Sequence, residues 1–144
     1  MNTKRAELAL CGLLSAGACT ASADPLITIA DARSSPAVVT DLGEPGDSVG
    51  DLLSFDQPLL DARGERIGTN SGICVRTRVG HSYQCQWTLT LANGTIQVAG
   101  RERDEGGSMI PIIGGTGDYA GASGEMRSVN NGDGTFTQTL HLAD

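Results

Sequence analysis

The sequence is poor in lysine, in aromatic residues and in long apolar runs. Its only lysine is Lys4, so a chain that loses its N-terminus has none for a Schiff base or a phosphate loop. Aromatic residues make up 3% and the formal net charge is -7, which argues against nucleic-acid binding by stacking or counterion release. No apolar run reaches the roughly 18 residues of a membrane-spanning helix. We therefore expect no nucleic-acid partner and no membrane span.

What the chain does contain is typical of a turn-rich β protein. Twenty glycines stand against five prolines without a collagen period, and no stretch keeps a helical repeat. From Tyr83 to Leu91 apolar and polar residues alternate, and the turn signals Asn93-Gly94 and Asn131–Gly134 precede further alternating segments. Eight or nine short strands predict an all-β sandwich or closed barrel. The expected strands cover residues 26–30, 37–40, 52–60, 67–77, 83–91, 95–98, 109–113, 125–130 and 135–142.

The N-terminus has the pattern of an export signal. A basic start at Lys4 and Arg5 precedes a short apolar stretch, and Ala21-Ser22-Ala23 forms an A-x-A cleavage site. We therefore expect a signal peptide over residues 1–23, a folded domain over 24–144, and a secreted or periplasmic protein. A loose lipobox before Cys19 leaves a lipid anchor on that residue as the alternative.

Two cysteines, Cys74 and Cys85, lie outside the leader. A hairpin turn centred on Val79-Gly80 places them directly opposite each other, where a disulfide can form in an oxidising compartment. The alternative is a pair of buried thiols. The same register moves Ile73 and Val75 to the other face of the strand, so either the register is wrong or both barrel faces are apolar and a second subunit covers the outer one.

Three blocks, in order, resemble the allene oxide cyclase family. They are Gly50–Phe55, Ile67–Val75 and Gly114–Gly124, and the last is also similar to the G-G-T-G segment of dirigent proteins. The resemblance runs from about Ser35 to Leu142. It implies an eight-stranded antiparallel, calycin-type β-barrel, a homo-oligomer (trimer or dimer) and an apolar cavity for a small apolar molecule. We expect no cofactor, and the lack of a C-x-x-C motif or a Cys/His cluster argues against a metal site.

The resemblance also suggests site residues. Ser35-Pro36 matches the Ser-Pro near the family's bound water, Gln57 falls where the family has an asparagine, and Cys74 matches a cysteine at the cavity floor. The family's polar residues on the first strand correspond to Ile27 and Ile29 here. Catalytic candidates are thus Ser35, Pro36, Gln57 and Cys74, together with Glu102 as an acid or base. Expected cavity-lining residues are Asn70, Tyr83, Trp87, Met109 and Tyr119.

Other motifs are better explained by structure than by chemistry. The G-x-G-x-x-A segment at Gly115 precedes no helical pattern and indicates a turn, and the Arg101–Glu105 charge run is typical of a solvated loop. A glycine at position 72 opposite Trp87 leaves room for the indole. Taken together, these features predict a barrel that confines a flexible apolar substrate (a fatty-acid epoxide, polyene or polyketide intermediate) and directs ring closure. The rivals are a non-catalytic ligand-binding barrel and a dirigent-like protein that orients radical coupling.

Overall fold

The structure, a computed structural model, describes residues 23–144 and consists of nine antiparallel strands and one short 3-10 turn. The predicted leader and the alternative anchor at Cys19 lie outside the described residues, apart from Ala23. The elements are β1 (Leu26–Asp31), β2 (Val38–Thr40), β3 (Leu52–Leu60), β4 (Arg66–Arg78), β5 (Ser82–Leu91), β6 (Gly94–Arg103), β7 (Gly107–Gly115), η1 (Gly117–Tyr119), β8 (Gly124–Asn130) and β9 (Thr135–Leu142).

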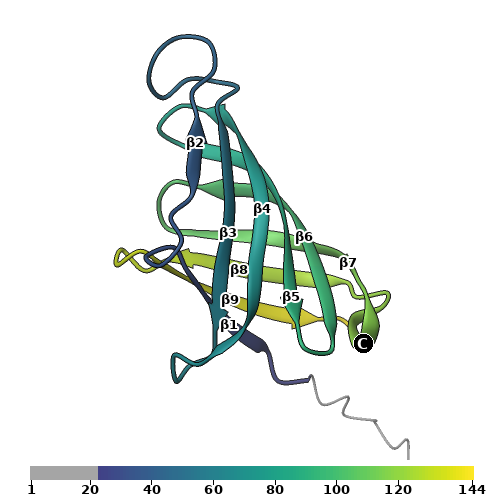
Figure 1. Ribbon diagram of the computed structural model, residues 1–144. Helices are drawn as coiled ribbons and strands as arrows, with labels where there is room; N and C mark the ends of the chain where they lie inside the picture. Colours follow the sequence, from purple (N-terminus) through teal and green to yellow (C-terminus); the bar gives the residue numbers. More distant parts are fainter. Residues whose placement is uncertain (1–22) are drawn as a thin grey trace, which may run out of the picture.

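The strands close into a barrel, as predicted. Consecutive strands pair from β3 to β9, β9 then pairs with β1, and β1 closes the ring by pairing with β3. The short strand β2 also pairs with β3, nearer the start of that strand, so β1 and β2 follow one another along the same edge (Figure 1). The result is a closed eight-stranded antiparallel barrel with β2 as an extra strand. Closure pairs the strand edges that would otherwise be exposed to solvent.

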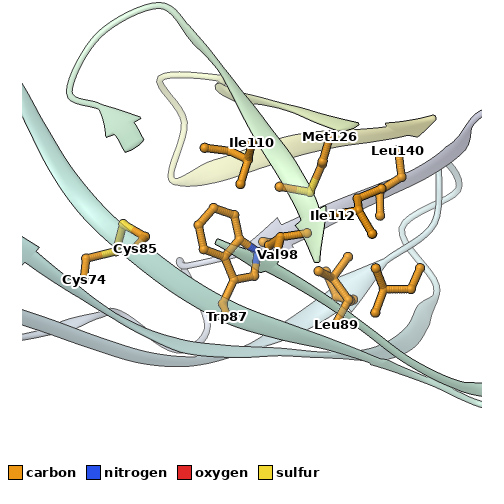
Figure 2. Close-up of a cluster of buried hydrophobic side chains, with 12 residues drawn as sticks. Cys74, Cys85, Trp87, Leu89, Val98, Ile110, Ile112, Met126 and Leu140 are labelled. Atoms are coloured by element: carbon orange, nitrogen blue, oxygen red, sulfur yellow. A yellow bond between two sulfur atoms is a disulfide. The ribbon is translucent and has the colours of Figure 1, made fainter. Parts of the chain in front are cut away.

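Alternation along the strands separates the two faces. Residues such as Leu89, Ile96 and Val98 point inward and are buried, whereas Gln84 and Gln86 point to solvent. The core fills one end of the barrel, where apolar side chains from β5 to β9 meet (Figure 2). The indole of Trp87 lies between this core and the Cys74–Cys85 disulfide (Figure 2).

The predicted register between β4 and β5 is confirmed. Cys74 pairs with Cys85 and Gly72 pairs with Trp87, and the two sulfur atoms form a disulfide with an S–S distance of 2.00 Å. Ile73 and Val75 consequently lie on the outer face, 46% and 38% exposed. Of the two explanations left open by the sequence, an apolar outer face is therefore correct at this position.

One turn prediction was wrong in detail. The hairpin between β5 and β6 forms, but Leu91 pairs with Gly94, so the two turn residues are Ala92 and Asn93. Gly94 instead begins β6, where a Cβ atom would lie 2.0 Å from the carbonyl oxygen of Thr116. The glycine is thus required by a close backbone approach rather than by a turn centred on Asn93-Gly94.

The disulfide is expected to contribute about 2 to 3 kcal/mol, because it closes an 11-residue separation in the unfolded chain. Replacing both cysteines with alanine should lower the free energy of unfolding by that amount in urea titrations. Adding reductant to the native protein should produce a similar loss and should leave the alanine pair unchanged. A reductant-insensitive native protein would contradict this expectation.

Candidate functional site

The barrel interior contains a chamber of about 80 Å³ that adjoins the packed core and shares Ala30, Trp87 and the disulfide with it. An apolar cavity of roughly 150 Å³ binds one benzene molecule, and the chamber has about half of this volume. It continues into an entrance of about 310 Å³ that shares Leu53, the disulfide and Glu102 with the chamber wall. A ligand must therefore occupy the chamber and the entrance together. The chamber is lined by Ala30, Leu53, Phe55, Gln57, Asn70, Cys74, Cys85, Trp87, Glu102, Ser128, Phe136 and Gln138.

The apolar part of the chamber wall is aromatic. Phe55 and Trp87 pack edge to face with ring centroids 6.3 Å apart, and Phe136 contributes a third ring. The two half-cystines complete this side of the wall. Such a surface suits a flat, largely apolar molecule.

The polar part of the chamber wall is a connected row of side chains. The Thr28 hydroxyl donates a hydrogen bond of 2.9 Å to Gln138 Oε1, and Gln138 Nε2 donates one of 3.3 Å to Asn70 Oδ1. Gln57 lies directly opposite Asn70 in the β3–β4 register. These four residues are buried in the barrel interior, so their polar groups face one another or the chamber.

Glu102 is the ionisable group of the chamber wall. It lies on β6 between the exposed residues Arg101 and Arg103, so the expectation of a solvated loop was wrong for this part of the charge run. Desolvation by burial raises the pKa of Glu102 to about 6, although the hydroxyls of Ser128 and Ser108 act in the opposite direction. Its Oε2 atom is enclosed and has no hydrogen-bond partner. A carboxyl group in this setting can both give and take a proton near neutral pH.

Arg76 is a buried charged residue in the wall of the entrance. Its guanidinium is buried and binds Asp47 through Nε and Asp104 through Nη1, each at 2.6 Å. The guanidinium carbon lies 3.8 Å from the ring centroid of Tyr83. Asp47 comes from the loop between β2 and β3, and Asp104 from the turn after β6. Arg76 therefore ties two loops together across the open end of the barrel.

The β2–β3 loop has a second support in Asp51. Its carboxylate accepts hydrogen bonds from the backbone N–H groups of Leu42 and Ser48, both at 2.8 Å. These bonds, led by the one from Leu42, lower the pKa of Asp51. The loop is thus fixed at both Asp47 and Asp51.

Replacing Arg76 with methionine is expected to destabilise the protein by about 2 kcal/mol, because Asp47 and Asp104 lose their shared cation. The two carboxylates keep some contact with water, so the cost stays below the roughly 3–5 kcal/mol of a fully buried pair. Adding Asp47→Asn and Asp104→Asn to Arg76→Met should recover about half of the loss in urea unfolding. No recovery would mean that packing, not charge, sets the effect.

The structure places most of the candidate residues around the chamber. Gln57, Asn70, Cys74, Trp87 and Glu102 line it. Tyr83 lines the entrance. Their catalytic roles remain predictions.

Four other candidates lie elsewhere. Met109 is 52% exposed on the outer face, because the inward positions of β7 are Ile110 and Ile112. Tyr119 lines a surface hollow near η1 and Leu142. Ser35 and Pro36 lie between β1 and β2, where the Ser35 hydroxyl donates a hydrogen bond to the Asp56 carbonyl rather than lining the chamber.

Sequence reasoning missed several residues of the chamber wall. Gln138 has the same strand parity as Phe136 and Leu140, so its polar side chain on an apolar face was the available signal. The resemblance placed the polar positions of the first strand at Ile27 and Ile29, so Thr28 between them was not considered. In the structure Ile27 is exposed, and Thr28 points inward and is buried. The contact of Ser128 with Glu102 could not be predicted, because it joins two strands that are separated by β7 and forms only once β6, β7 and β8 have paired.

Within residues 23–144, no group of three or more His, Cys, Asp and Glu side chains is arranged to hold a metal ion. The same described part of the chain contains no helix long and apolar enough to cross a membrane.

Solved structures with the same barrel have varied activities. A pyocyanin demethylase shares 26% of residues with a TM-score of 0.72, and the match covers 83% of this chain and 99% of that one. A pterocarpan synthase dirigent protein shares 18% with a TM-score of 0.62, covering 82% of this chain and 91% of that one. A Diels-Alderase from Streptomyces koyangensis shares 20% with a TM-score of 0.65, covering 84% and 62%. The last two likenesses show the fold.

A search of curated protein sequences found no match. The model of the allene oxide cyclase barrel-like domain matches residues 31–137, which is most of the chain. This match agrees with the closed barrel and with the position of the three sequence blocks. The chain therefore belongs to the allene oxide cyclase barrel-like family.

Proposed function

We propose that the protein is a cofactor-independent isomerase or cyclase that confines a compact, largely apolar substrate and directs ring closure within it. The observation that carries this proposal is Glu102, a partly buried carboxyl group with a pKa of about 6 in the wall of an otherwise aromatic chamber. An ionisable group is costly to desolvate, and groups with such shifted pKa values gather at functional sites.

In the proposed reaction Glu102 acts first as a base. Its carboxylate takes a proton from a carbon atom next to an electron-withdrawing group, and the C–H electron pair enters the conjugated system. That carbon then bonds to an unsaturated carbon of the same molecule, and the resulting carbanion takes the proton back from Glu102. Substrate and product are therefore isomers, and no co-reactant is consumed. The walls hold the two carbons in contact, which supplies most of the rate increase.

The size of the site limits the substrate. The chamber and the entrance together suit a molecule of one to three rings after closure, whereas a long fatty-acid chain would leave most of its length outside. Among the substrates predicted from the sequence, this favours a compact polyketide-like intermediate over a fatty-acid epoxide.

The test is turnover of a panel of compact, uncharged unsaturated ketones by the full-length protein. A product of unchanged mass but different chromatographic retention, formed with one handedness in excess, is the expected result. Because a pyocyanin demethylase has the same barrel, N-methylated tricyclic aromatics belong in the panel. Native mass spectrometry of gently purified protein separates the rival: a carrier retains a ligand through purification and converts nothing in the panel.

We also propose an extracytoplasmic location and a homo-oligomer. The disulfide is typical of oxidising compartments, and removal of residues 1–23 would leave the barrel domain at 24–144. Exposed Ile73 and Val75 on the outer face favour cover by a second copy. Intact-mass measurement of the exported protein tests the cleavage, and light scattering after gel filtration tests the oligomer.

A further inference from the structure

The orientation of one buried amide in the chamber indicates what the substrate must offer. Asn70 Oδ1 accepts the hydrogen bond from Gln138 Nε2, which leaves Asn70 Nδ2 as a donor. Within residues 23–144, no group accepts a hydrogen bond from Asn70 Nδ2. The enclosed side-chain atoms of this range that have no partner are Trp87 Nε1 and Glu102 Oε2. Asn70 Nδ2 is therefore not enclosed, and its N–H groups open into the chamber that Asn70 lines.

The donor is held in place by two residues behind it. Gln138 can donate to Asn70 because its own oxygen is occupied by the hydroxyl of Thr28. Thr28 and Gln138 are almost completely buried, so water does not compete for these bonds. If Thr28 lost its hydroxyl, the Gln138 amide could turn over and reverse the direction of the whole row.

The chamber offers nothing to bind a negatively charged group. None of its twelve lining residues is Arg, Lys or His, and Glu102 adds negative charge at neutral pH. At the entrance, the guanidinium of Arg76 is already bound by Asp47 and Asp104, and the exposed Arg103 lines the entrance but not the chamber. A ligand carboxylate inside the chamber would therefore be desolvated without a cation to pair with it.

We infer that the part of the substrate inside the chamber is an uncharged conjugated ketone whose oxygen accepts a hydrogen bond from Asn70 Nδ2, with Thr28 and Gln138 as positioning residues. The carbonyl end lies beside Phe55 and Trp87, the flat ring system extends past Phe136 into the entrance, and Gln57 opposite Asn70 provides a further amide toward the same oxygen. The hydrogen bond stabilises the negative charge that develops on the oxygen when Glu102 removes the neighbouring proton.

This inference rests on the proposed function in taking the chamber as the substrate site, so it is tested with probes that do not react. The probes are 1-indanone and indane, which differ by one carbonyl oxygen. Trp87, the single tryptophan of the sequence, lies in the chamber wall, and its fluorescence reports binding of both probes. The carbonyl stretching frequency of bound 1-indanone, measured by infrared difference spectroscopy, reports the hydrogen bond.

The full-length protein should bind 1-indanone about tenfold more tightly than indane, and the bound carbonyl should absorb at lower frequency than in hexane. Thr28→Ser keeps the hydroxyl and should retain both effects. Thr28→Val keeps the shape and should reduce the preference to less than about threefold, return the carbonyl frequency toward its hexane value, and leave indane affinity within about twofold. Asn70→Leu should abolish the preference.

Equal affinity for the two probes, no binding of either, or a carbonyl frequency identical in the native protein and Thr28→Val would overturn the inference. The outcomes for the two proposals are distinct. Ketone preference without turnover of any panel compound contradicts the enzyme proposal and retains the carbonyl site. Turnover without ketone preference retains the enzyme and removes the role of Asn70.

Discussion

Replacing Glu102 with glutamine is expected to lower turnover about 10²- to 10⁴-fold while ligand binding is retained. Glutamine has nearly the same shape and hydrogen-bonding reach, so the chamber wall stays intact, but it cannot accept a proton from carbon. The measurement is kcat on a substrate from the panel, with 1-indanone affinity as the check on the chamber. Glu105→Gln, an exposed change three residues along the chain, is the matched control and should leave kcat unchanged.

The role of Glu102 as a base also predicts the direction in which kcat changes with pH. Because Glu102 acts as a base, kcat of the native protein should rise with pH through about 6 and then level off. Burial raises the folded-state pKa above the ordinary value of 4.5, so protonation favours the folded state. Stability from this group is therefore full below pH 4.5 and is lost as pH rises through about 6, by at most about 2 kcal/mol. This loss should be absent from Glu102→Gln, and a native rate that falls above pH 6 would refute the base role.

Replacing Gly72 with alanine is expected to cost roughly 4 kcal/mol and to lower Tm by roughly 10 to 15 °C. A Cβ atom at this position would lie 2.3 Å from Trp87 Cβ and 2.4 Å from the Gln86 carbonyl oxygen. Neither atom is the end of a flexible side chain, so β4 and β5 would have to separate. The measurement is thermal unfolding followed by circular dichroism.

Gly114→Ala is the matched control for this change. Gly114 also lies in a strand, and a Cβ atom there would meet nothing within 4 Å. Its substitution should change Tm by no more than about 3 °C. Similar losses in the two variants would show that strand glycines as such, and not the approach to Trp87, determine stability.

Much of the fold could be predicted because alternation and pairing are local properties. The predicted hairpin turn at Val79-Gly80 determines which residues of the two strands face each other. It predicted the pairs Cys74–Cys85 and Gly72–Trp87, and both were confirmed. The turn at Asn93-Gly94 was placed one residue late because the constraint on Gly94 comes from Thr116, which is distant in the sequence. Local pattern cannot report such a contact.

The candidate site was less accessible to prediction for the same reason. The charge run around Glu102 resembles a solvated loop in sequence, and only Ser108 and Ser128, from two later strands, show that the carboxyl is enclosed. The resemblance placed Gln57 and Cys74 correctly in the chamber wall. It failed for Met109, whose strand parity opposes that of the buried Ile110 and therefore places its side chain on the outer face.

The pairing of β1 with β9 has a consequence for how the protein is made. Leu26 pairs with Leu140, and Thr28 reaches Gln138 across 110 positions of sequence, so the ring stays open until the last strand has left the ribosome. Contacts of such long sequence separation slow folding, and until closure the edges of β1 and β8 are unpaired. A chain cut before Thr135 would leave two strand edges with unpaired backbone groups, and we expect it to aggregate.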